Sequence, residues 1–251
     1  MRDLYAVNLL RRKQKHMSII NHLSKARRYE EYLRRTVPEE AQEAFQTVLT
    51  ATSDDPAFVL MCTSPNDLRG VLVLWLFHLF QAGEIRQGTF RCALEACWDH
   101  DYGILLNTIR EDISNPRRFL RSMFERAGFP MPRDVPSQVD IWRGTNGISA
   151  RTAKRGIAWT TDYDVACWFA MRFAHGSRIP LVLKATVPPA DVIFLTTSEE
   201  SEVIYFDGTT AEIDGTEEGW READERVQRA RREKQLALHD EWQRSRSLSV
   251  L

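Results

Sequence analysis

The spacing of hydrophobic residues changes at residues 128–136, a segment that holds three prolines within seven residues. Before it, apolar residues recur three or four positions apart, as in amphipathic helices; after it, short β-like runs take over. Proline neither continues a helix nor donates to a sheet ladder, so the segment is a natural domain boundary. The sequence therefore predicts an α+β chain, with a helical N-terminal domain over residues 1–135 and a second domain over residues 136–251 that contains a β-sheet and a C-terminal helix.

Local signals place several helices in the first domain. Thr36 is predicted to be an N-cap, because Glu39 stands three residues later and completes a capping box. Gly128 and Pro130 are typical of the end of a helix. Further helices are predicted over residues 64–83, 90–99 and 116–127.

The second domain reads as short strands separated by Gly, Pro, Asp and Ser clusters. Residues 162–174 are spaced as a helix that packs on the sheet, with Thr161 or Asp162 as its cap. Residues 217–251 hold eight basic and eight acidic residues, which predicts a solvated helix packed along one edge. The strands are predicted over residues 139–142, 157–160, 180–187, 192–195 and 202–206.

Charge, cysteine content and hydropathy exclude several classes of protein. Lys and Arg total 34 and Asp and Glu total 35, so the chain lacks the basic excess of a general nucleic-acid coat. The four cysteines form no C-x-x-C pattern, so we expect neither a metal site nor a disulfide framework. We therefore expect the protein to reside in a reducing compartment, the cytoplasm. The longest apolar run, residues 71–77, is too short for a bilayer, and the N-terminus lacks a secretory pattern, so we expect no membrane partner.

The first 36 residues form a locally basic segment, with ten Lys or Arg against three acidic residues. A solvated helix face is the simpler interpretation of such a segment. An anionic partner, nucleic acid included, is the alternative.

Three short segments of the second domain carry residue types suited to chemistry. Alone, each has an ordinary structural explanation: a salt bridge, a well-capped helix and an acidic surface strand. Alternation within a strand would put Glu200 and Glu202 on one face, about 7 Å apart along the backbone. The segments are Trp142-Arg143-Gly144, Trp159-Thr160-Thr161 and Glu200-Ser201-Glu202.

Taken in order, these segments resemble the motifs of the mono-ADP-ribosyltransferases of the Arg-Ser-Glu class, bacterial toxins and relatives that split NAD and transfer ADP-ribose. That family has an aromatic-Arg-Gly strand, then an aromatic-Ser-Thr-Ser strand, then Glu-x-Glu. The resemblance covers residues 139–214 and departs from the family at the first serine, where Thr160 stands, with Thr161 as second candidate. It implies a split β-sheet domain that uses NAD as co-substrate and no metal.

The resemblance also implies roles for individual residues. Glu202 would stabilise the oxocarbenium-like ribose and hold its 2′-hydroxyl. Arg143 would grip a phosphate of NAD in two places, and Gly144 would offer backbone groups to the nicotinamide carboxamide. Thr160 or Thr161 would orient Glu202 by hydrogen bonding.

Two further implications concern the ligand rings and the acceptor. Trp159 is a candidate to stack on the nicotinamide or adenine ring. A glutamate at the position of Glu200 goes with arginine as acceptor, because it orients a guanidinium and assists loss of its proton. The loop at residues 195–199 matches the family's target-recognition turn.

We therefore expect a bacterial or phage toxin or effector that modifies protein arginine, in its own cytoplasm or after delivery into another cell. The helical domain would recognise the target or hold an inhibitor or antitoxin. One alternative keeps the fold and modifies RNA or DNA, as in toxin–antitoxin systems or phage defence. Another is a non-catalytic phage or prophage interaction protein.

Overall fold

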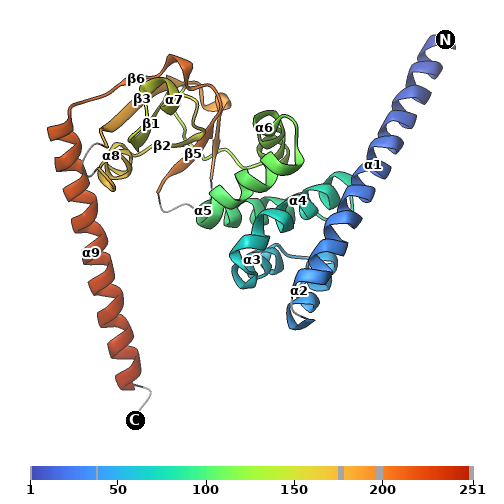
Figure 1. Cartoon of the computed structure of the whole chain (residues 1–251), viewed down its shortest axis with the longest axis horizontal. Coiled ribbons are helices and arrows are strands. Elements are labelled where there is room, and N and C mark those ends of the chain that lie inside the picture. The colour runs from blue at the N-terminus through green and yellow to red at the C-terminus, as the bar shows by residue number, and fades with distance from the viewer. Residues whose placement is uncertain (1, 38, 175–177, 196–199, 249–251) are drawn as a thin grey trace. The chain divides into compact units, whose positions relative to one another are not determined.

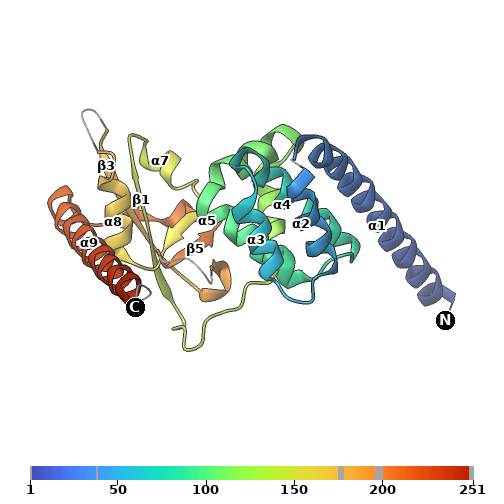
Figure 2. The same cartoon turned by 90° about the horizontal axis from the view of Figure 1, so that it is seen from below.

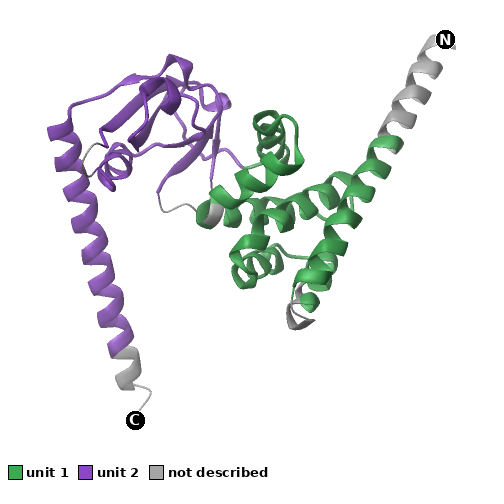
Figure 3. Cartoon of the chain, viewed as in Figure 1, with its two compact units in different colours: residues 1–129 green, residues 130–251 purple. Residues whose placement is uncertain are grey.

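The computed structural model describes residues 2–37, 39–174, 178–195 and 200–248. It divides the chain into unit 1, residues 1–129, and unit 2, residues 130–251 (Figure 3). The division falls inside the proline-rich segment at residues 128–136. Unit 1 is helical and unit 2 combines helices with one antiparallel sheet, so the predicted α+β class is confirmed. None of the helices in the described ranges combines the length and the apolar character needed to cross a bilayer.

Helices are present at the predicted positions 64–83, 90–99 and 116–127 of unit 1, but the second is much longer than predicted, and the helix at Asp55–Thr63 has no counterpart in the prediction. α6 covers the predicted residues 116–127 and is capped by Asn115, whose side chain accepts from Arg118 N. Thr36 is not an N-cap: it is the last residue of the preceding helix, and its hydroxyl donates to Tyr32 O at 2.8 Å. The helices are α1 (Arg2–Thr36), α2 (Glu39–Thr50), α3 (Asp55–Thr63), α4 (Asn66–Ala82), α5 (Gln87–Asp112) and α6 (Pro116–Ala127).

The apolar run at residues 71–77 forms the centre of unit 1. It lies in α4, which packs against both α1 and α5 (Figure 1). Gly70 lets α5 approach closely, because a Cβ there would overlap the Thr108 side chain. His78 is 1% exposed, and its Nδ1 lies 2.8 Å from His22 Nδ1 on α1. This segment is therefore a buried core helix.

Unit 2 is built on a six-stranded antiparallel sheet in the order β4-β5-β2-β1-β3-β6. All five predicted strands are present, and β6 is an additional short edge strand. The strands are β1 (Val139–Asn146), β2 (Ala158–Thr160), β3 (Pro180–Val187), β4 (Val192–Phe194), β5 (Glu202–Tyr205) and β6 (Glu212–Ile213). The helices are α7 (Ala150–Ala153), α8 (Tyr163–Met171) and α9 (Glu217–Leu248), with short 3-10 turns at Pro189–Asp191 and Gly208–Thr210.

The sheet is held unevenly along its width. β1 pairs with β3 in continuous register from Val139↔Val187 to Asn146↔Pro180. Between β1 and β2 the register holds a single pair, Trp142↔Thr160. Few backbone hydrogen bonds therefore join the β4-β5-β2 side of the sheet to the β1-β3-β6 side.

Two helices cover one face of the sheet. α8 packs on β1 and α9 packs on α8, so that α8 lies between α9 and β1 (Figure 2). Trp220 and Ala223 of α9 are buried against α8, whereas residues 228–243 of α9 are exposed. The predicted solvated helix packed along one edge is confirmed.

Candidate active site

The three sequence segments lie on three neighbouring strands, β5, β2 and β1. Thr160 is the Cα partner of Trp142 on one side and of Glu202 on the other. Side chains at paired positions of adjacent strands share a face of the sheet. Thr160 and Glu202, which are distant in sequence, are therefore brought side by side.

Thr160 is a buried anchor for the backbone around it. It is 4% exposed, and its Oγ1 donates to Glu200 O at 2.7 Å and accepts from Asp162 N at 3.0 Å. One hydroxyl thus ties the turn before β5 to the start of α8. Its hydrogen bonds go to the backbone of Glu200 and Asp162, so it positions Glu202 through the chain.

Thr161 makes a weaker set of contacts. Its backbone N–H donates to Ser201 O at 3.0 Å, and its hydroxyl lies 3.4 Å from the same oxygen. Thr161 is half-buried, whereas Thr160 is buried. Of the two candidate hydroxyls, the one of Thr160 therefore does more to hold the segment that contains Glu202.

Glu200 and Glu202 do not share a strand. β5 begins at Glu202, Glu200 lies in the turn before it, and Ser201 between them has φ 51°, in the left-handed region. The expectation that alternation aligns both carboxylates on one face is therefore wrong, because the period of two starts only at Glu202. A non-glycine residue in this conformation stores strain and is common at functional sites.

Arg143 lies on β1, which neighbours β2 in the sheet. Its side chain points to the opposite face of the sheet from the side chains of Thr160 and Glu202. Trp142, its neighbour in β1, shares a face with Thr160, and alternation turns Arg143 away from that face. Trp159 of β2 lies on the face of Arg143, in the core cluster with Ile141. The structure thus brings Glu202 and Thr160 together and places Arg143 across the sheet from them.

The Arg143 guanidinium rests against the start of β2. Its Nη1 donates to Ala158 O, and a Cβ at Gly156 would overlap the guanidinium. Only glycine at 156 leaves room for this arrangement. Residues 156–158 therefore form the position in which the Arg143 guanidinium is held.

Gly144 and Trp159 have structural roles in this conformation. A Cβ at Gly144 would lie 2.8 Å from Ala170 N and still closer to the carbonyl oxygen of Ala166, so this glycine allows α8 to pack on β1. Trp159 is 2% exposed, and its Nε1 donates to Gly156 O at 3.2 Å. Its ring is therefore a core element, and this placement does not support the predicted stacking on NAD.

A residue of α9 joins the site that sequence reasoning did not single out. Arg231 Nη2 lies 2.9 Å from Glu200 Oε1, with side-chain exposures of 46% and 28%. The same guanidinium lies over the Trp168 ring of α8, 3.7 Å from its centroid. The sequence offers no local signal for this contact, because Arg231 is one of many charged residues in an exposed helix.

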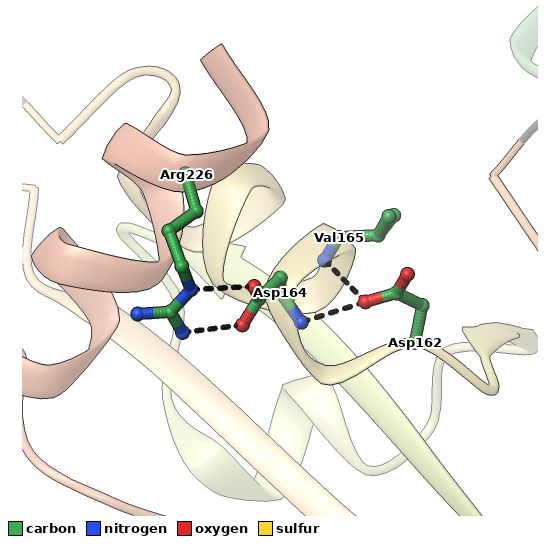
Figure 4. A network of polar contacts seen from close by, with 4 residues as sticks. All are labelled: Asp162, Asp164, Val165 and Arg226. Atoms are coloured by element: carbon green, nitrogen blue, oxygen red, sulfur yellow. Dashed lines mark hydrogen bonds and ion pairs between the residues drawn. The ribbon is translucent and has the colours of Figure 1, made fainter. Parts of the chain in front are cut away.

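A second arginine of α9 fixes the helix to α8. Arg226 Nε and Nη2 donate to the two carboxylate oxygens of Asp164 at 2.8 and 2.7 Å (Figure 4). Asp162 caps α8 by accepting from Asp164 N at 2.8 Å and Val165 N at 3.2 Å (Figure 4). Asp162, one of two predicted caps, is confirmed as the cap of α8. This network holds α9 where Arg231 meets Glu200.

The thiol of Cys167 and the phenol hydroxyl of Tyr163, both on α8, are not activated as nucleophiles. Burial raises the pKa of the Cys167 thiol to about 12, and burial likewise raises the pKa of Tyr163 to about 12. Both therefore stay protonated at neutral pH. Within the described ranges, no three His, Cys, Asp or Glu side chains gather as they would around a metal ion. The charged groups of the three segments are the carboxylates of Glu200 and Glu202 and the guanidinium of Arg143.

The proposed target-recognition turn at residues 195–199 falls mostly on residues 196–199, which lie outside the described residues. Comparisons of the chain with family models, with curated proteins and with solved structures found no match. What the site does is therefore inferred from its geometry and from the residue pattern.

Proposed function

We propose that unit 2 is an NAD-dependent mono-ADP-ribosyltransferase domain that transfers ADP-ribose to an arginine of an acceptor protein. The observation that carries this proposal is the register in which Thr160 pairs with both Trp142 and Glu202. It puts the three segments that resemble the family's motifs on neighbouring strands, although some 60 positions separate Trp142 from Glu202. Motifs on adjacent strands are a stronger indication than the same motifs in sequence alone, although the side chain of Arg143 leaves the sheet on the other face.

Glu202 is the residue suited to the charge that develops on the ribose. It is half-buried at the first position of β5, where its backbone oxygen accepts from Leu195 N at 3.2 Å. When the bond between nicotinamide and C1′ stretches, C1′ becomes oxocarbenium-like, and a fixed carboxylate stabilises that charge. Thr160 would keep Glu202 in place by holding the preceding turn.

Arg143 would bind the diphosphate of NAD near the start of β2. Ala158 and Thr160 are two residues apart, so the anchored guanidinium and Glu202 are offset by about 7 Å along β2. Because Arg143 and Glu202 leave opposite faces of the sheet, contact of one dinucleotide with both groups would require a change at the β1–β2 pairing, which holds a single Cα pair. Phosphate oxygens would then replace Ala158 O as acceptor of the Arg143 Nη1 hydrogen bond.

Glu200 would orient the acceptor guanidinium. Its carboxylate already binds one guanidinium, that of Arg231, at 2.9 Å. Arginine as acceptor is supported by this contact, because planar guanidinium groups match carboxylate geometry well.

Nicotinamide release from labelled NAD by the purified full chain tests the proposed activity. We expect Glu202→Gln to lower the rate at least about 100-fold, the usual worth of one such group. Glu212→Gln is the matched control, since Glu212 is an exposed glutamate on β6 of the same sheet. No release by the wild-type chain would contradict the proposal and favour a non-catalytic interaction protein.

A second measurement concerns the acceptor. We expect Glu200→Gln to keep most of the nicotinamide release but to lose transfer to a small guanidine such as agmatine. Equal loss of both would contradict the division of roles between Glu200 and Glu202. Labelled NAD in a lysate treated with nuclease or with protease tests protein against nucleic acid, because the label is lost only where its acceptor is digested.

A further inference from the structure

The contact between α9 and Glu200 places an arginine of this chain where an acceptor arginine would bind. Arg231 Nη2 lies 2.9 Å from Glu200 Oε1, and the guanidinium lies over the Trp168 ring at 3.7 Å. A guanidinium held by a carboxylate at its edge and by an aromatic ring at its face has a fixed plane and position. Both partners belong to unit 2, as Arg231 does.

The strength of this placement comes from the packing of α9. An ion pair as exposed as Arg231–Glu200 contributes little by itself. The start of α9 is buried through Trp220, and Arg226 binds both oxygens of Asp164. These contacts keep Arg231 beside Glu200 at a high effective concentration, whatever the concentration of other acceptors.

Arg231 is also linked to the residue that acts on the ribose. Glu200 O accepts from Thr160 Oγ1 at 2.7 Å, and Thr160 is the register partner of Glu202. The guanidinium of Arg231 therefore contacts Glu200, two residues before the proposed catalytic carboxylate of Glu202. In the proposed reaction, this contact would bring an arginine nitrogen near the C1′ that Glu202 stabilises.

We infer that Arg231 is a site of self-modification, an arginine to which the chain transfers ADP-ribose within the same molecule; this rests on the function proposed above. A guanidinium nitrogen of Arg231 forms a bond to C1′ of the nicotinamide ribose. The bond between C1′ and nicotinamide breaks, and its electron pair leaves with neutral nicotinamide. One guanidinium proton passes to Glu200 and then to water, so NAD supplies the group and no other reactant is needed.

Incubation of the full chain with NAD, followed by intact-mass and peptide-mass measurement, tests this site. We expect the wild-type chain to gain one ADP-ribosyl group on Arg231. Arg231→Lys keeps the positive charge but lacks the guanidinium, so it should lose the modification while nicotinamide release continues. Arg232→Lys is the matched control, because Arg232 is the exposed neighbour on α9 and its Nε donates to Gln228 O at 3.3 Å.

Two further measurements separate the outcomes. Modification within one molecule predicts that the fraction modified per minute does not change when the protein is diluted tenfold. A rate that falls in proportion to protein concentration, or a modification that persists in Arg231→Lys, would overturn the inference. Nicotinamide release without modification of Arg231 would overturn it and leave the proposed function standing, whereas no release at all would overturn both.

Discussion

Replacement of Thr160 by valine removes one hydroxyl while keeping the shape of the side chain. In the wild type this hydroxyl makes two short hydrogen bonds, 2.7 Å to Glu200 O and 3.0 Å from Asp162 N, at a residue that is 4% exposed. Each such bond contributes about 1 kcal/mol net, and a backbone group left without a partner costs more. We expect Thr160→Val to lower the free energy of unfolding of unit 2 by about 2–3 kcal/mol.

Urea unfolding followed by tryptophan fluorescence measures this change. Five of the seven tryptophans lie in unit 2, so the signal reports mainly on that unit: Trp142, Trp159, Trp168, Trp220 and Trp242. Thr160→Ser keeps the hydroxyl, and its free energy of unfolding should fall by about 1 kcal/mol, the cost of removing one buried methyl group. Thr161→Val is the control at the neighbouring hydroxyl, whose contact is longer, at 3.4 Å.

The same variants test the role of Thr160 in the reaction. We expect nicotinamide release to fall in Thr160→Val and to be restored in Thr160→Ser, because the hydroxyl holds the turn that precedes Glu202. A Thr160→Val chain that is as stable and as active as wild type would refute the positioning role of this residue.

Two further predictions follow from other parts of the structure. Gly144→Ala should destabilise unit 2 by about 1–3 kcal/mol, because its Cβ would overlap the backbone of α8. Gly103→Ala is the control: the new Cβ would meet open space, so this variant should be neutral or stabilising. The urea midpoints of the two variants are compared with that of the wild type. Burial, helped by the charges of His22, Lys25 and Arg28, lowers the pKa of His78 to about 3 from 6.5. Between these two pKa values the unfolded chain binds more protons than the folded chain. The free energy of unfolding of unit 1 should therefore fall by about 2 kcal/mol as the pH falls from 7 to 5. The urea midpoint of unit 1 should show this slope in the wild type and much less of it in His78→Gln, and a flat wild-type profile would contradict it.

Local patterns were sufficient to predict most secondary structure. Pro180–Val187 and Pro116–Ala127 have the predicted bounds, because proline, glycine and the apolar period act over a few residues. Thr36 shows the limit of such signals: a capping pattern in sequence does not reveal that α1 continues to that residue.

The sequence by itself also determined which residue types are available for chemistry, but only the tertiary structure decided how they are arranged. Strand order and helix docking decide three features of the site. They pair Thr160 with Glu202, turn the Arg143 side chain to the opposite face of the sheet and bring Arg231 into contact with Glu200. A shift of one residue in a strand reverses the face of a side chain, and a contact between α9 and a turn 31 positions earlier leaves no local trace. These features arise from long-range packing, which is why the site could be proposed from the residue pattern and its geometry could not.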